Sequence, residues 1–167
     1  MLWLLTYLKS RYPNFHTVVA GRLYRSATPK PADLEKWQRE HAIKTWVDLR
    51  MPKDYINEPS FFAAQCATAK RLGIKRISLP LDDFGVVSDE QIRVGLELLS
   101  DATKSPTLVC CRGARHRAGL LCCLFRMKFQ GWTAEAALAE AKAAGYYKHG
   151  HERFDDRFMD LIGMPRN

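Results

Sequence analysis

The stretch at residues 107–119 reads TLVCCRGARHRAG, and it decides what fold and chemistry the rest of the chain must support. Within it, Cys111 and Arg117 lie between an apolar run at 107–109 and a helical pattern that starts at Gly119. In a strand-to-helix loop, backbone N–H groups can converge on an anion, and the helix N-terminus adds roughly half a positive charge. The same field favours the thiolate of Cys111, and the planar fork of Arg117 can hold two phosphate oxygens. The spacing therefore predicts an anion-binding loop with a nucleophilic thiol, as Cys-based phosphoryl transfer requires.

Two simpler interpretations compete with this one. Cys111 could be a small buried hydrophobe, as free cysteines often are, and Arg117 could be a surface arginine. Cationic and titratable neighbours argue against the first, and a cation at a helix start is unfavourable unless an anion compensates it. The residues that would line the phosphate site are Arg112, Gly113, Ala114, Arg115 and His116.

Three of these lining residues leave their roles open. The side chains of Arg112 and Arg115 could stand at the mouth of a pocket or be solvated charges on an exposed loop. His116 could orient Cys111 or Asp83, or simply donate a hydrogen bond to nearby backbone, which is the commoner role of a histidine.

A departing alkoxide or phenoxide needs a proton, so a carboxylic acid should reach the loop. The turn at 81–87, LDDFGVV, follows a predicted strand and supplies two candidates. We favour Asp83 as the general acid and keep Asp82 as the alternative acid, since at least one of them should be a solvated turn residue. Arg50 ends another strand, and we expect it to form a structural ion pair rather than to contact substrate.

The hydrophobic pattern predicts an α/β fold, because strands alternate with helices and further helices cluster at the C-terminus. These elements favour a mostly parallel sheet covered on both faces, with the thiol loop at the carboxyl edge of a strand, where such folds bind ligands. We expect an apolar N-terminal segment at 1–14 and one catalytic domain at 15–167. The predicted strands are 22–26, 45–49, 74–79 and a strand after Pro106 that carries the thiol. The first predicted helix opens near 31, and another follows a capping box at Ser88 and Gln91. The other predicted helices cover about 61–72, 118–130, 133–144 and 152–162.

The net charge of the 167-residue chain is +8, from 26 Lys and Arg against 18 Asp and Glu. This excess indicates anionic partners such as phosphorylated substrates. No basic run is interleaved with aromatic residues, so we do not expect nucleic-acid binding. We expect a monomer.

Five cysteines form an odd set with two vicinal pairs and no disulfide or zinc spacing. This pattern favours a reducing, cytoplasmic location and neither a metal nor another cofactor. We expect the second pair, Cys122 and Cys123, in the core.

The N-terminal segment MLWLLTYL at 1–8 is apolar but far shorter than the ~20 residues that cross a bilayer. It also lacks the basic region and the cleavage site of a signal peptide. We expect it to dock on the domain, and a membrane-surface contact through residues 1–8 is the less favoured alternative.

Together these residues resemble the Cys-dependent protein tyrosine and dual-specificity phosphatase superfamily, whose loop reads His-Cys-x-x-Gly-x-x-Arg-Ser/Thr. Segments at 21–29, 43–50, 81–87 and 131–140 look like further motifs of its compact atypical dual-specificity members, in the same order. The resemblance covers roughly residues 15–160. It implies a four- or five-stranded sheet flanked by helices, a phosphocysteine intermediate and no metal. The run at 115–117 is also similar to a plant and fungal group, some of which act on inositol pyrophosphates.

Three residues depart from the family pattern. Cys110 replaces the histidine before the nucleophile, which could make the vicinal pair sensitive to oxidation. Ala114 replaces a glycine, so a positive φ there would strain it by about 1 kcal/mol. Ala118 replaces the hydroxyl residue that stabilises the departing thiolate, and we therefore expect slow breakdown of the phosphoenzyme.

The sequence predicts a metal-independent phosphatase of the phosphotyrosine or dual-specificity type. The alternatives are an inositol polyphosphate or phosphoinositide phosphatase, and a weakly active phosphate-binding pseudophosphatase. A rhodanese-type sulfurtransferase also uses a loop thiol near cations, but it needs no general acid.

Overall fold

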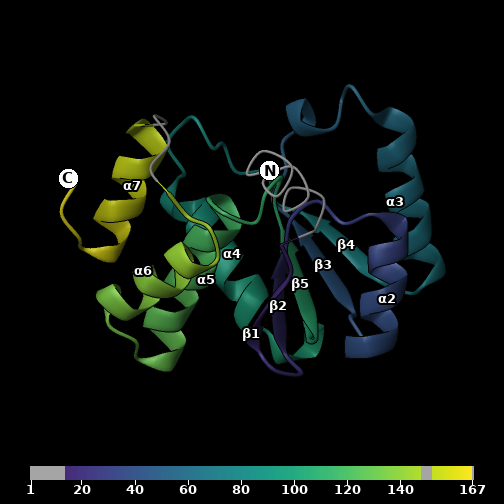
Figure 1. The fold of residues 1–167 in the computed structure, drawn as a ribbon, viewed down its shortest axis with the longest axis horizontal. Helices are drawn as coiled ribbons and strands as arrows, with labels where there is room; N and C mark the ends of the chain where they lie inside the picture. The colour runs from purple at the N-terminus through teal and green to yellow at the C-terminus, as the bar shows by residue number, and fades with distance from the viewer. Residues whose placement is uncertain (1–13, 148–151, 167) are drawn as a thin grey trace, which may run out of the picture.

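The computed structural model describes residues 14–147 and 152–166, and it is built on one five-stranded sheet in the order β1-β2-β5-β3-β4 (Figure 1). β1 pairs antiparallel with β2, while the other three pairings are parallel. The prediction of an α/β fold with a mostly parallel sheet is confirmed. The strands are β1 (His16–Val19), β2 (Leu23–Ser26), β3 (Thr45–Asp48), β4 (Lys75–Ser78) and β5 (Thr107–Cys110).

Helices begin and end largely where local sequence signals place them. Ser88 accepts the backbone N–H of Gln91 in the capping box that opens α4, and Thr133 accepts the N–H of Ala136 at the start of α6. Gly131 takes φ 67° at the end of α5, a conformation that favours glycine. The helices are α2 (Pro31–His41), α3 (Pro59–Arg71), α4 (Asp89–Ser100), α5 (Arg117–Gln130), α6 (Ala134–Ala143) and α7 (Glu152–Ile162), with short 3-10 turns η1 (Pro52–Asp54) and η2 (Ala102–Lys104).

Helices cover both faces of the sheet. Figure 1 shows α2 and α3 on one side and α4 to α7 on the other. Leu34 and Trp37 of α2 belong to the smaller of two hydrophobic clusters, and residues of α4 to α7 fill the larger one. The sequence-based expectation of a sheet covered on both faces is therefore confirmed.

The central strand β5 carries the thiol loop at its carboxyl end. Cys110 is in register with Ser26 of β2 and with Asp48 of β3, so both neighbouring strands end at the same edge. The loops that follow β3, β4 and β5 therefore converge there, at the place where open α/β sheets bind ligands.

Two sequence predictions concern the N-terminus and the membrane. Residues 1–13 of the proposed segment lie outside the described residues, so its docking stays a prediction. Within residues 14–147 and 152–166, no helix is long and apolar enough to cross a bilayer. The strand β1 was not predicted from the sequence.

Candidate active site

The loop from Cys111 to His116 connects β5 to α5, and Arg117 is the first residue of α5. The side chain of Cys111 lies in the larger hydrophobic cluster, and the residue is only 2% exposed. Arg117 is 1% exposed, although it carries a full charge. The two residues that the sequence singled out thus lie at one buried strand-to-helix junction.

Three consecutive carbonyl groups of the loop are held from outside it. The backbone N–H of Thr28 donates to the Arg112 oxygen at 3.2 Å, the Asn14 side-chain amide donates to the Gly113 oxygen at 3.0 Å, and the Arg25 guanidinium donates to the Ala114 oxygen at 2.5 Å. In a planar trans peptide, the C=O group of one residue and the N–H group of the next point in opposite directions.

The N–H groups of Gly113, Ala114 and Arg115 are therefore turned toward the inside of the loop. None of them donates to another residue in the part of the chain that the structure describes. Successive N–H groups that point inward form an anion-binding concavity, and the start of α5 adds its positive end. The loop thus has the geometry that its spacing predicts.

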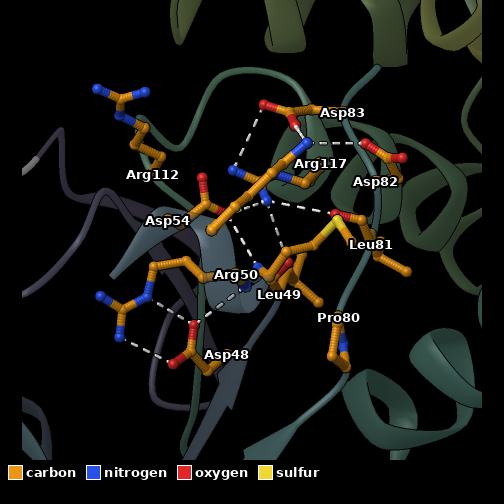
Figure 2. Close-up of polar contacts among 12 residues, drawn as sticks. Asp48, Leu49, Arg50, Asp54, Pro80, Leu81, Asp82, Asp83, Arg112 and Arg117 are labelled. Atoms are coloured by element: carbon orange, nitrogen blue, oxygen red, sulfur yellow. Dashed lines mark hydrogen bonds and ion pairs between the residues drawn. The ribbon is translucent and has the colours of Figure 1, made fainter. Parts of the chain in front are cut away.

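Arg117 is fixed by contacts from two other loops, which follow β3 and β4 (Figure 2). Its Nη1 donates to Asp54 Oδ2 at 2.6 Å and to the carbonyl oxygens of Leu49 at 3.4 Å and Leu81 at 3.3 Å. Its Nη2 lies 3.6 Å from Asp83 Oδ2. Burial alone would lower the pKa of Arg117, but the nearby Cys111, Asp54 and Asp83 raise it, so the guanidinium stays charged. The buried cation at a helix start is therefore compensated by anions.

The two candidate acids differ in what they face. The Asp83 side chain is 17% exposed and lies between Arg117 and Lys53, whose Nζ is 3.4 Å from Asp83 Oδ1. The Asp82 side chain is 42% exposed and accepts the Phe84 N–H at 3.0 Å within its own turn. That hydrogen bond, together with the Lys53 ammonium, holds the pKa of Asp82 below its usual range, although burial opposes this. The structure thus brings Asp83 to the arginine and leaves Asp82 at the surface.

The remaining polar side chains of the loop are exposed or contact Tyr147. Arg112 is exposed and extends away from Arg117 in Figure 2. Arg115 is exposed, and its guanidinium carbon lies 5.9 Å from the centre of the Tyr147 ring. His116 Nε2 is 2.9 Å from the Tyr147 carbonyl oxygen, to which it donates. Of the two roles left open for His116, the structure shows the hydrogen bond to backbone.

Several residues that shape the site were missed from the sequence. Asn14 and Arg25 hold the loop from outside, and Asp54 and Lys53 contact its arginine and the candidate acid. A weak signal existed for Arg25, which is a charged residue inside a short buried strand. No local signal distinguishes Asp54 from the other charged residues near it.

Comparison with known proteins agrees with this geometry. A model described as the tyrosine phosphatase family matches residues 11–165. The chain belongs to this family. The inositol diphosphatase DSP4 of Arabidopsis thaliana is 30% identical over 152 residues, which cover 90% of this chain and 72% of DSP4.

A second relative is the dual specificity protein phosphatase TpbA of Pseudomonas aeruginosa, which is 28% identical over 74% of this chain and 51% of TpbA. The chain thus spans about half the length of this relative. The crystal structure of TpbA matches with a TM-score of 0.69 at 25% identity, covering 92% of this chain and 86% of that one. The core catalytic domain of the PP-IP phosphatase SIW14 from S. cerevisiae, in complex with citrate, has the same fold, with a TM-score of 0.70 at 21% identity over 90% and 86% of the two chains.

Ala114, which replaces a family glycine, has a φ of 57°. The condition for strain that the sequence raised is therefore met, and a non-glycine residue in this region is strained by about 1 kcal/mol. The hydrogen bond from buried Arg25 to the Ala114 carbonyl holds the strained peptide in place.

Cys110, which replaces the family histidine, lies in the smaller hydrophobic cluster, whereas Cys111 lies in the larger one. The Cys110 sulfur accepts the indole N–H of Trp46 at 2.9 Å and donates to Asp48 Oδ1 at 3.6 Å. Burial, reinforced by the Asp48 charge, raises the pKa of the Cys110 thiol well above its usual range. A thiol that stays protonated is a poor nucleophile, and the two sulfurs lie in different hydrophobic clusters. This geometry argues against ready oxidation of the vicinal pair.

Asp48, the last residue of β3, forms ion pairs with Arg50 and with Arg76 of β4. Arg50 Nε and Nη2 donate to its two oxygens at 2.8 Å each, and Arg76 Nε donates at 3.0 Å. The predicted structural ion pair of Arg50 is confirmed. Burial alone would raise the pKa of Asp48, but the two arginines lower it overall.

Replacement of Asp48 with alanine is expected to lower the free energy of unfolding by about 3–5 kcal/mol at neutral pH, because it leaves the buried Arg50 and the half-buried Arg76 without this partner. Because the folded-state pKa is depressed, this contribution is present above the ordinary aspartate value of about 3.9 and is lost as pH falls through the lower folded-state value. Urea unfolding of both proteins at several pH values measures the difference. Asp101→Ala, which removes a more exposed carboxylate that pairs with Lys104, is the control with a far smaller effect. Equal losses in the two variants would contradict the prediction.

Within residues 14–147 and 152–166, no group of three or more His, Cys, Asp or Glu side chains is placed to hold a metal ion. The expectation of metal-independent chemistry stays a prediction that chelation can test.

Proposed function

We propose that this chain is a metal-independent phosphatase that hydrolyses phosphate monoesters, of the tyrosine or dual-specificity type, through a phosphocysteine intermediate. The observation that supports this most is the loop itself. Cys111 starts a turn whose N–H groups point inward, and a buried, anchored Arg117 closes it. An anion held there places its central atom beside the thiol.

The reaction has two steps. The Cys111 thiolate attacks phosphorus, an S–P bond forms, and the ester P–O bond breaks while Asp83 gives its proton to the leaving oxygen. Asp83, now a carboxylate, then takes a proton from water, whose oxygen attacks phosphorus and releases phosphate and the thiolate. The inward N–H groups and Arg117 stabilise the charge on the phosphoryl oxygens in both steps.

The substrate we propose is a phosphorylated anion. The loop arginines and the net charge of +8 suit phosphotyrosine peptides and highly charged inositol phosphates. Relatives of both kinds exist, since DSP4 is an inositol diphosphatase and a TpbA crystal structure holds pTyr. Action as a monomer in the cytoplasm remains part of this proposal.

The test is phosphate release by the purified chain in the presence of EDTA. We expect turnover of p-nitrophenyl phosphate, and a panel of phosphopeptides, phosphoinositides and soluble inositol phosphates then ranks the substrates. Phosphate binding without release from any of them would favour a pseudophosphatase. Thiosulfate:cyanide transfer without phosphatase activity would favour a sulfurtransferase.

The buried Ala118 predicts the rate-limiting step. Because no hydroxyl donates to the departing sulfur at this position, we expect a burst of p-nitrophenol of about one equivalent per enzyme, followed by slower steady turnover. Ala118→Ser should raise the steady rate and reduce the burst in stopped-flow traces. Fast turnover of the unaltered chain without a burst would contradict this.

A further inference from the structure

The carboxylate of Asp54 is built into the site, although nothing in the loop sequence points to it. Asp54 ends the η1 turn after β3, and its side chain is 5% exposed. One oxygen, Oδ2, accepts both the N–H of Met51 at 2.8 Å and Arg117 Nη1 at 2.6 Å. The η1 turn thus holds the carboxylate in place, and the carboxylate in turn holds the guanidinium of Arg117.

The contacts of Arg117 are distributed unevenly over its guanidinium group. All three hydrogen bonds to Asp54, Leu49 and Leu81 use Nη1. Nη2 has one ion pair at 3.6 Å, to Asp83, and Nε has no partner among the described residues. A bidentate grip on a phosphate uses two neighbouring nitrogens of the fork. Because the anchoring hydrogen bonds use Nη1, the Nε–Nη2 edge stays available to bind an anion.

Asp54 is unsuited to the other role that a buried carboxylate could have here. Burial would raise its pKa, but the hydrogen bond and charge of Arg117 lower it overall. A group held as a carboxylate does not donate protons near neutral pH, so it does not compete with Asp83 as the acid.

We propose that Asp54 is a positioning residue, which orients Arg117 so that its Nε–Nη2 edge grips the phosphoryl group. This inference rests on the proposed function, because it assigns the mode of anion binding at the same site. The neighbouring Lys53 contacts Asp83, so the η1 turn touches both the arginine and the candidate acid.

The first test is the affinity for inorganic phosphate, measured by calorimetry on the whole chain. Asp54→Asn keeps an acceptor for the Met51 N–H but removes the charge that holds Arg117. We expect phosphate to bind roughly ten- to a hundredfold more weakly, as for the loss of a hydrogen bond between charged groups. KM for p-nitrophenyl phosphate should rise by a similar factor with a smaller change in kcat, because Arg117 holds the phosphoryl group before and during reaction.

Two variants separate positioning from a general structural effect. Asp101→Asn alters the carboxylate that caps the other short 3-10 turn, η2, where Asp101 accepts the Thr103 N–H, and should leave phosphate affinity unchanged. Asp54→Glu retains the charge and should recover part of the affinity. An Asp54→Asn protein that binds phosphate as tightly as the unaltered chain, or more tightly, would overturn the proposal and make Asp54 a competitor of the anion.

A crystal structure of the unaltered chain with tungstate tests the proposal even if Asp54→Asn does not fold. The expected complex has tungstate oxygens on Nε and Nη2, with Asp54 still bonded to Nη1. Tungstate on Nη1 with Asp54 displaced would overturn it. If the chain binds phosphate but releases none from any substrate, the proposed function fails while the role of Asp54 is still decided by these measurements.

Discussion

Replacement of Cys111 with serine is expected to abolish phosphate release, with a loss of about 10⁴-fold or more in kcat. A serine hydroxyl is not ionised near neutral pH and is a much weaker nucleophile than a thiolate, so the first step has no comparable attack on phosphorus. The inward N–H groups and Arg117 are untouched. Phosphate affinity should therefore stay within a few-fold of that of the unaltered chain, as calorimetry can measure.

The matched control is the same substitution one residue earlier. Cys110 is equally buried but lies between Trp46 and Asp48, where a serine hydroxyl can accept and donate the same hydrogen bonds. Cys110→Ser should keep most of the activity. A Cys111→Ser protein with activity within tenfold of the unaltered chain would contradict Cys111 as the nucleophile. Loss of activity in Cys110→Ser alone would assign the nucleophile to Cys110.

The sequence predicted what depends on local patterns. Alternating strands and helices gave the parallel sheet, and the order of apolar runs placed the turn with Asp83 at the edge where Cys111 lies. These features are set by residues close in the chain, which is why a single sequence is sufficient for them.

The contacts that complete the site join residues far apart in the sequence. The hydrogen bond from Arg25 to Ala114 spans 89 positions, and that between Asp54 and Arg117 spans 63. Which charged residue of the segment after β3 reaches Arg117 is decided by the 3-10 turn at Pro52–Asp54 and not by charge or hydrophobicity. The antiparallel edge strand β1 was missed because its four residues are too short a run to show a clear alternating pattern, and they pair only with β2.

Replacement of Asp83 with asparagine is expected to lower kcat by about 10²–10⁴-fold for esters with a poor leaving group, since general acid catalysis contributes that much. Alkyl phosphates and phosphotyrosine need the proton, whereas p-nitrophenolate leaves without much help. The loss should therefore be much smaller for p-nitrophenyl phosphate. In the pH profile of kcat/KM, the basic limb that reports the protonated acid should disappear.

Asp82→Asn is the matched control for this experiment, because Asp82 is the adjacent carboxylate and shares the contact with Lys53. Its side chain is more exposed and bonds within its own turn, so the variant should retain the basic limb and most of the rate. The opposite pattern, with Asp82→Asn slow and Asp83→Asn active, would assign the acid to Asp82. In that case Asp83 would serve Arg117 as a second anion, and the turn at residues 81–87 would have to move before the Asp82 carboxyl could reach a leaving group.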